Sequence, residues 1–294
     1  MIINQIVSGG GSPAAIPGYY VKREVDGNGK LVCDSTQTTI STYPATDVGD
    51  YGLGGWRNGL AIQTIETVDC SSLTQISGNN AFQYAFLSAN PCDFDFSNVT
   101  TISGDFVFFK AFMYASLNNT SEIEFTSLTS ITGGYVFEYA FAEAGDIYTV
   151  TFPALTSAGN DAFVLAFASD KEDGAGLYCP ISTVDFSVLQ QAGNNCFMRA
   201  FKEGDLYEIE FPALTSAGNS CFSYAFENNL SIGSVTFGGT SAITLGTDVF
   251  DSMFDMCSQD IDVYAPAANQ AAIEAMTGYP SFGCTGTVTW HWQS

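Results

Sequence analysis

Residues 209–226 have the sequence IEFPALTSAGNSCFSYAF, and this stretch decides the fold because close copies of it recur along the chain. The same pattern returns over residues 150–167 as VTFPALTSAGNDAFVLAF. The other copies, some of them looser, are residues 68–86, 94–112, 123–141, 184–201 and 235–254. Self-similarity at a period of roughly 20–50 residues predicts a solenoid, in which each unit buries its apolar face only by packing on its neighbours.

One phenylalanine keeps its place in every copy and sets the length of the repeat. The successive spacings are 26, 29, 26, 34, 25 and 28 residues. These phenylalanines are Phe82, Phe108, Phe137, Phe163, Phe197, Phe222 and Phe250. A degenerate, glycine-rich copy over residues 39–62 is typical of the capping unit that closes the end of a stack. We therefore expect about eight coils.

Each copy has three parts with different local preferences. The first part alternates polar and apolar residues, as in residues 208–211, and this period of two predicts a short, half-buried strand. A turn rich in Gly, Ser and Thr follows, as in LTSAG over residues 214–218. In the last part, AFxxAF, the two aromatic side chains have the spacing of one face of a helical turn. The expected fold is mainly β with short helical turns.

The sequence predicts three regions. Residues 1–38 form a small N-terminal arm and hairpin, in which an apolar run over residues 2–7 precedes Gly9, Gly10 and Gly11. Residues 39–264 form the repeat array, and residues 265–294 form a C-terminal cap with a helix after Pro266 and a final strand. We expect the arm to serve attachment or oligomerisation, because an apolar strand on a flexible joint can pair with a partner.

The charge balance excludes several classes of partner. The chain has 31 acidic and 8 basic residues, which gives a net charge of −23. Nucleic-acid binding and polybasic membrane contacts need a basic surface, so neither is expected. No apolar run has transmembrane length and no signal peptide is recognised, so we expect neither membrane insertion nor export by such a signal. The acidic excess therefore has one of three roles: it keeps the protein soluble, it binds a basic partner surface, or it binds divalent cations.

The eight cysteines do not predict a disulfide framework or a zinc site. Cys196 and Cys221 occupy a repeat position that is Ala or Val in other copies, so they are expected to act as small core residues. The cysteines have no CxxC spacing. Free thiols are the expected state.

Catalysis is not expected from this sequence. His291, between Trp290 and Trp292, is the only histidine, so multi-histidine metal sites are excluded and a histidine-dependent nucleophile has one candidate base. No phosphate-binding loop or metalloprotease motif is present. Carboxylates are abundant, but a glycosidase needs two at a defined separation in a cleft. We therefore predict no catalytic residue, no metal site and no cofactor, apart from the calcium alternative below.

The outward side of the strands is the most informative expected surface. Side chains alternate inward and outward along a strand, which places a set of acidic residues outside. Asp93 and Asp95 are expected beside Glu122 and Glu124, where facing like charges would cost up to ~1 kcal/mol. Bound Ca²⁺ or a basic partner would relieve this repulsion; the alternative is an acidic surface that is simply solvated. The candidate binding residues are Asp93, Asp95, Glu122, Glu124, Asp185, Glu208 and Glu210.

The repeats resemble the BspA-like leucine-rich repeats of bacterial surface proteins. In that family an apolar strand, a Pro, a turn ending in Gly and an Ala-Phe pair follow one another. Here Phe152–Pro153, Ala158–Gly159 and Ala162–Phe163 match in that order, and the resemblance covers about residues 40–280. The second AF pair and the longer period depart from the family pattern. The resemblance implies a leucine-rich-repeat solenoid with a longer helical segment in each coil.

The family is composed chiefly of adhesion and binding modules. An array without an export signal and with a Gly-rich arm is similar to the members carried on phage virion proteins. The resemblance therefore implies a non-enzymatic virion structural protein, such as a tail fibre, baseplate or head decoration, assembled in the host cytoplasm. Its expected partners are other virion proteins through residues 1–30, a host surface protein or glycan, and copies of itself, with a trimer favoured. The alternatives are a bacterial cell-surface adhesin and, less favoured, a carbohydrate-acting enzyme.

Overall fold

The structure is a computed structural model. It describes residues 73–86, 93–115, 122–145, 147–169 and 179–294, together with the backbone of short strands before residue 70. The first two strands, β1 (Arg23–Val25) and β2 (Leu31–Cys33), pair antiparallel as the predicted hairpin requires. The predicted arm, residues 1–20, lies outside the described residues.

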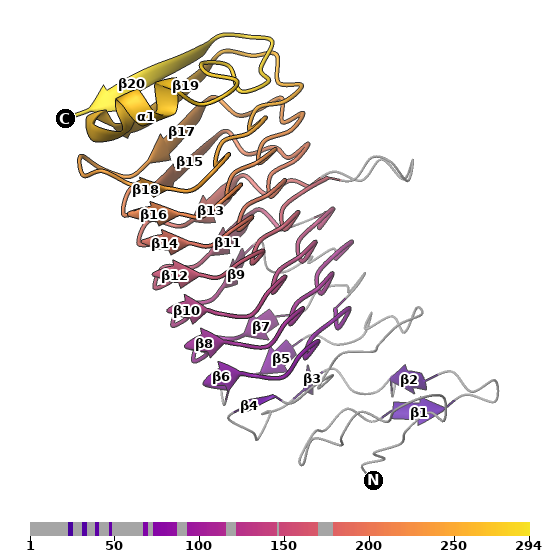
Figure 1. The fold of residues 1–294 in the computed structure, drawn as a ribbon. Helices are drawn as coiled ribbons and strands as arrows, with labels where there is room; N and C mark the ends of the chain where they lie inside the picture. Colours follow the sequence, from indigo (N-terminus) through magenta and orange to yellow (C-terminus); the bar gives the residue numbers. More distant parts are fainter. Residues whose placement is uncertain are drawn as a thin grey trace.

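The chain folds as a mainly β solenoid, as the repeat pattern predicts, and one side of it is a single parallel sheet (Figure 1). This sheet has eight strands, one from each successive coil, and each strand is two residues long. The strands are β4 (Asp47–Val48), β6 (Gln75–Ile76), β8 (Thr101–Ile102), β10 (Ser130–Ile131), β12 (Ser157–Ala158), β14 (Gln191–Ala192), β16 (Ser216–Ala217) and β18 (Thr244–Leu245). Eight such strands agree with the expected number of coils.

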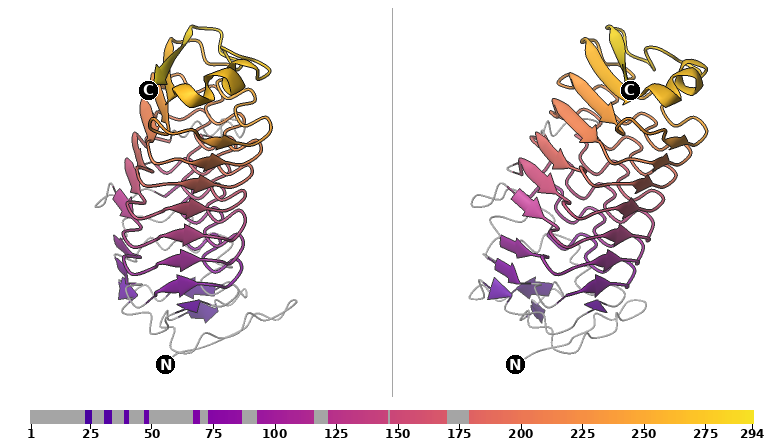
Figure 2. Two further views of the ribbon diagram at one scale, coloured as in Figure 1. Left: turned by 60° about the vertical axis from the view of Figure 1, so that its left-hand side comes forward. Right: turned by 90° about the vertical axis from the view of Figure 1, so that its left-hand side faces the viewer.

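A second row of strands runs up another side of the molecule (Figure 2). It is divided into three parallel sheets, with the orders β3-β5-β7, β9-β11-β13 and β15-β17-β19-β20. The strands are β3 (Thr39–Ile40), β5 (Thr67–Asp69), β7 (Asp93–Asp95), β9 (Glu122–Glu124), β11 (Thr149–Thr151), β13 (Thr183–Asp185), β15 (Glu208–Phe211), β17 (Ser234–Phe237), β19 (Ile261–Pro266) and β20 (Val288–Gln293).

The third side of each coil, formed by the AFxxAF segments, consists of successive turns and contains no helix in the described coils, so the predicted helical turns are wrong there. In the coil of residues 135–143, the φ angles of Tyr135, Tyr139 and Glu143 are 54°, 53° and 52°, all in the left-handed region. The alternate amides bond to the next coil, as in Phe137 N–H to the carbonyl of Ala162 at 2.8 Å. The amides between them bond locally, as in Ala140 N–H to the carbonyl of Phe137 at 2.9 Å, so bonds between coils alternate with local turn bonds and no continuous helix forms.

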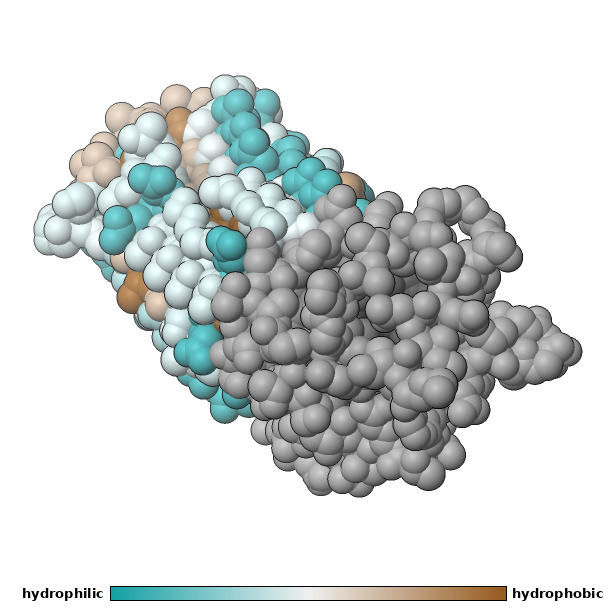
Figure 3. Space-filling model, turned by 90° about the horizontal axis from the view of Figure 1, so that it is seen from below, coloured by the Kyte–Doolittle hydropathy of each residue, from teal (hydrophilic) through white to brown (hydrophobic). Residues whose placement is uncertain are grey.

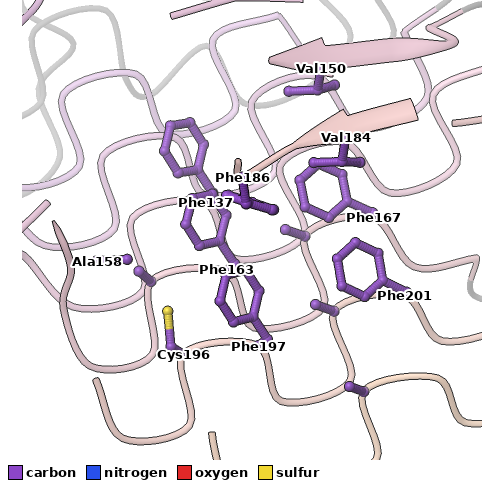
Figure 4. Close-up of a cluster of buried hydrophobic side chains, with 14 of the residues drawn as sticks. Phe137, Val150, Ala158, Phe163, Phe167, Val184, Phe186, Cys196, Phe197 and Phe201 are labelled. Atoms are coloured by element: carbon purple, nitrogen blue, oxygen red, sulfur yellow. The ribbon is translucent and has the colours of Figure 1, made fainter. Parts of the chain in front are cut away.

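The interior consists of columns of stacked phenylalanine rings. Phe137, Phe163 and Phe197 occupy the same place in consecutive coils, with ring centroids 5.2 and 5.3 Å apart (Figure 4). Phe186, from the strand part of its coil, meets Phe197 edge-on at 5.0 Å. Ring stacking within a column and edge contacts between columns are the preferred aromatic geometries, so each coil fits its neighbours closely.

The cysteines behave as predicted within the described part of the chain. Cys196 and Cys221 are fully buried at equivalent core positions, and all five described cysteines are free thiols. Burial raises the pKa of Cys221 to about 12. These side chains therefore pack as small apolar residues.

The C-terminal cap has little helix. A 3₁₀ turn, η2 (Ala267–Asn269), leads into the short α1 (Gln270–Glu274), and β20 follows as the last strand. The predicted helix after Pro266 is thus present but brief. No helix among the described residues has the length and apolar character needed to cross a membrane.

Candidate functional site

The strand face, defined here as the outward side of β7, β9, β11, β13, β15, β17, β19 and β20, carries acidic residues in register with hydroxyl-bearing ones. In the sheet of β9, β11 and β13, Glu122 lies beside Thr149, which lies beside Thr183. The inward residues between these rows are apolar, as with the buried Ile123 and Val150. The second outward row consists of Glu124, Thr151 and Asp185. The predicted alternation of inward and outward side chains is therefore confirmed for this sheet.

Asp93 and Asp95 belong to the coil next to that of Glu122 and Glu124, but the two acidic strands are not paired in one ladder. Strand β7 ends one sheet and β9 begins the next, so the two acidic strands are not hydrogen-bonded partners. A second interruption separates β13 from β15, where acidic residues would again face each other. Like charges directly opposite each other destabilise a ladder, and both interruptions lie where acidic residues would face each other. The rule is not universal here, because Asp69 and Asp95 are paired in register.

The predicted binding residues fall into two groups. Asp95 and Asp185 are partly buried, and each carboxylate accepts a bond from the amide two residues later, Ser97 at 3.0 Å and Ser187 at 2.8 Å. They serve local turns. The side chain of Asp93 lies outside the described residues. The exposed members of the set are Glu122, Glu124, Glu208 and Glu210.

Several aromatic residues join the acidic ones at the C-terminal end of the strand face, whereas the middle sheet has the single exposed Tyr148 among its described residues. Register places Glu210 in one row with Thr236 and Tyr264, and Glu208 in the other with Ser234 and Asp262. We call this surface the acidic–aromatic patch. Its members are Tyr207, Glu208, Glu210, Asp262, Tyr264 and His291. It combines exposed charge with aromatic rings, a composition typical of protein recognition surfaces.

The patch holds its aromatic side chains in fixed positions. The ring of His291 stacks on that of Tyr264 with centroids 4.6 Å apart, and His291 Nε2 lies 2.8 Å from an Asp262 carboxylate oxygen. Tyr207 is 66% exposed, and its ring lies against the backbone of Gly233, where a Cβ atom would come within 2.9 Å of it. Sequence analysis missed the two tyrosines, because only the register between coils brings them beside the carboxylates.

This arrangement offers binding but no evident catalysis. His291 and Asp262 form a pair on an open sheet surface, without a nucleophile placed against the imidazole by any described contact. The described residues contain no group of three or more His, Cys, Asp or Glu side chains able to hold a metal ion. The patch can therefore present carboxylates and ring faces to a partner. The contacts among the described residues do not support a catalytic role for this patch.

Other charged groups lie on the turn side of the coils. Arg199 Nε is 3.0 Å from a Glu227 carboxylate oxygen, and Lys202 Nζ is 3.7 Å from the other. Glu138 lies on the same side of an earlier coil. Burial raises its pKa, the positive charge of Lys110 lowers that pKa, and the negative charge of Asp161 raises it. These groups link neighbouring coils, so their role is structural.

The eight-stranded sheet presents an uncharged outward row in its described coils, in contrast to the strand face. The hydroxyl of Thr129 donates to the carbonyl of Thr100 in the preceding coil at 3.0 Å, and Thr215 donates in the same way to Gln190. The row consists of Gln75, Thr101, Ser130, Ser157, Gln191, Ser216 and Thr244.

Seen from below, the coloured part of the molecule is mostly hydrophilic or intermediate, with isolated apolar positions (Figure 3).

Comparisons with known proteins add little to this description. No family model matches the sequence, and no curated protein matches it. Among solved structures, a leucine-rich repeat protein from Bacteroides ovatus is similar, with 13% identity and a TM-score of 0.37, over 92% of this chain and 75% of that one. The pneumococcal vaccine antigen PcpA is similar with 13% identity and a TM-score of 0.30, over 95% of this chain and 87% of that one.

Proposed function

We propose that this protein is a non-enzymatic structural and binding protein, and that the acidic–aromatic patch is its recognition surface. The observation that supports this proposal is the register of β15, β17, β19 and β20, which places carboxylates and aromatic rings together on one exposed sheet. The apolar core lies on the inward side of these strands and does not depend on the outward residues. A cationic partner fits this surface, because Glu208, Glu210 and Asp262 present negative charge beside aromatic rings.

We further propose that the protein is a component of a phage particle, as a tail fibre, baseplate or head decoration. In this proposal residues 1–30 attach the solenoid to other virion proteins, copies associate, with a trimer favoured, and the repeats face outward towards a host surface protein or glycan. The Gly-rich stretch of residues 9–11 supports the proposal, because it would let an attached arm hold the rigid solenoid away from the particle.

Binding at the patch is tested with an oligolysine peptide and with calcium chloride as separate probes in titration calorimetry. The double variant Glu208→Gln/Glu210→Gln is expected to weaken oligolysine binding by about threefold to tenfold, since two exposed charge contacts are lost. The matched control is Glu122→Gln/Glu124→Gln, which changes the same charges on a sheet where Tyr148 is the single described exposed aromatic residue and no aromatic cluster forms. Equal losses in both variants would show non-specific attraction to an acidic surface.

Cryo-electron microscopy of the assembly purified from its source tests the phage proposal. A particle that carries the chain through its N-terminal region supports it. Copies found only on a cell envelope favour the alternative, a bacterial cell-surface adhesin. Turnover of a glycan by the purified protein, as opposed to binding alone, would contradict both and favour a carbohydrate-acting enzyme.

A further inference from the structure

The last coil closes two of its three sides with its own residues. Next to β18, the buried side chain of Asn269 takes the place of a further strand, accepting from the Ile243 amide and donating to the Ile243 carbonyl, both at 2.8 Å. On the turn side, the Phe254 amide donates to the Phe282 carbonyl at 3.0 Å, and Thr285 donates to the Cys257 carbonyl at 2.8 Å. Both sides are therefore capped.

The third side ends at β20, and its outer edge has no cap among the described residues. The Thr287 carbonyl accepts from the Ile261 amide at 2.8 Å, so it faces β19. Backbone groups of successive strand residues point to opposite edges. The peptide groups of Val288, Trp290 and Trp292 therefore face away from β19, and within the described chain none of them has a backbone partner. Figure 1 shows no strand beyond β20.

This edge lacks the usual protection against pairing. Natural edge strands are shortened, bulged, or marked by charged residues or Pro. Strand β20 is six residues long, has the sequence VTWHWQ, and contains neither an acidic residue nor a lysine. Trp290 and Trp292 pack on the core but stay partly exposed at its end. An added strand would satisfy the free peptide groups and cover these rings.

We infer that the free edge of β20 is a strand-addition site, and that its occupant is the segment of residues 2–7 from a second copy of this chain. That segment, IINQIV, has four β-branched residues and lies outside the described structure. Residues 1–23 contain no acidic residue, and Lys22 and Arg23 are basic. In a protein of net charge −23, an uncharged strand on a basic stem can approach the C-terminal end of another copy without repulsion.

Such a contact is heterologous, because it joins the N-terminal segment of one copy to the C-terminal edge of another. Repetition of a heterologous contact gives an open head-to-tail chain when its geometry does not close a ring. The glycines of residues 9–11 supply a joint between the strand and its own solenoid. The inference specifies the association between copies proposed above, and it stands without the proposed attachment to a phage particle.

The test compares the full chain with the variant Ile6→Pro and the matched control Ile6→Val. Proline removes a backbone donor and blocks strand pairing, whereas Val keeps the strand preference. We expect sedimentation velocity to show association that grows with concentration in the full chain and in the control, and monomers in the Pro variant. Hydrogen exchange at the amides of Val288, Trp290 and Trp292 should be about tenfold or more faster in the Pro variant.

Three outcomes would overturn the inference. First, the Pro variant could associate as the full chain does. Second, at a concentration at which the full chain associates, the three amides could exchange equally fast in the full chain and in the Pro variant. Alternatively, the full chain could stay monomeric at every concentration. Monomers with protected amides would identify the chain's own arm as the occupant, and monomers with unprotected amides would mean that the edge is free. Equal unfolding temperatures of the three proteins would show that the solenoid is intact.

Discussion

At the scale of single residues, the phenylalanine columns account for much of the stability. Phe163 is fully buried, stacks between Phe137 and Phe197, and meets Phe152 edge-on at 5.2 Å. Aromatic pairs of this geometry add about 0.5–1.5 kcal/mol to the energy of burial. Each ring therefore joins three coils.

Replacing Phe163 by Ala should lower the free energy of unfolding by about 3–5 kcal/mol, because it removes a large buried ring and leaves a cavity between two coils. Chemical denaturation followed by circular dichroism measures the change. Phe109→Ala is the control, since Phe109 lies at the partly exposed outer side of its coil. A loss at Phe163 no larger than that at Phe109 would contradict the importance of the columns.

A second residue-scale feature is the left-handed backbone at every fourth position of the turn side. Leu165 has a φ angle of 53° and is only partly buried. The left-handed region disfavours residues with a Cβ atom by about 1–2 kcal/mol, and Asn tolerates it best among non-glycine residues. In the next coil Asn195, at the position equivalent to Asp161, has a φ angle of 52° in the same region.

The variant Leu165→Asn should therefore raise the free energy of unfolding, by about 0.5–1 kcal/mol after the lost apolar contact is counted. Leu165→Val should lower it, because a β-branched side chain fits this conformation least well. The two variants are compared by thermal unfolding. Destabilisation by Asn as large as that by Val would show that packing of Leu165 outweighs backbone strain.

Glu138 gives a pH dependence at the residue scale. Burial raises the pKa of Glu138 above its ordinary value, so the folded state holds the proton more strongly than the unfolded chain. Below the unfolded pKa, 4.5, both states are protonated and no penalty exists. As the pH rises through that value and then through the folded pKa, the penalty grows to its full size.

The variant Glu138→Gln should therefore unfold at a higher temperature than the natural chain at neutral pH, and the difference should disappear in acid. Thermal unfolding over a series of pH values checks this. The exposed Glu122→Gln is the control. A stabilisation that persists unchanged at low pH would rule out ionisation as the cause.

At the scale of elements, close approach of successive coils restricts the residue that follows the inner strands. Gly218 lies after β16, and an added Cβ atom would come 2.6 Å from the backbone nitrogen of Asn194 in the preceding coil. Gly145 lies in an exposed connection and would meet no atom within 4 Å.

Substitution Gly218→Ala should therefore destabilise the protein by about 1–3 kcal/mol, because two backbones would have to separate. Gly145→Ala, the matched control, should stay within about 0.5 kcal/mol. Denaturant titration distinguishes them. Similar small effects at both positions would mean that the coils can part without cost.

The elements also show where sequence reasoning succeeds and fails. Alternation along residues 122–124 and 208–211 predicted the outward carboxylates correctly, because the direction of a strand side chain is a local property. The AFxxAF segments were predicted as helical, since their aromatic spacing fits a helical turn equally well. Every second amide bonds instead to a peptide group in the next coil, about 25–34 residues away, which a local pattern does not reveal. The contact of His291 with Asp262 and Tyr264 has the same origin.

At the scale of the whole molecule, the net charge of −23 acts against compactness. Neighbouring coils are about 4.8 Å apart, well within the screening length of about 10 Å at 0.1 M salt. Repulsion between acidic residues of successive coils is therefore felt at ordinary ionic strength.

Raising sodium chloride towards 1 M, where the screening length falls to about 3 Å, should increase the unfolding temperature. Differential scanning calorimetry measures this. Calcium chloride at matched ionic strength should add nothing if screening alone acts. An additional increase with calcium, lost in Glu122→Gln/Glu124→Gln, would instead indicate the cation binding considered for these acidic residues.

The hydrogen bonds between coils run along the long axis of the solenoid. A force that pulls the two ends of the molecule apart therefore acts directly on these bonds. When the ends are drawn apart, the coils carry the same load in series and detach from the stack one at a time. With 25–34 residues between equivalent phenylalanines, every rupture releases roughly 80–120 Å of chain. The coil between Phe163 and Phe197 releases the longest piece. A force trace therefore consists of steps of unequal length, and their order shows which coils detach first.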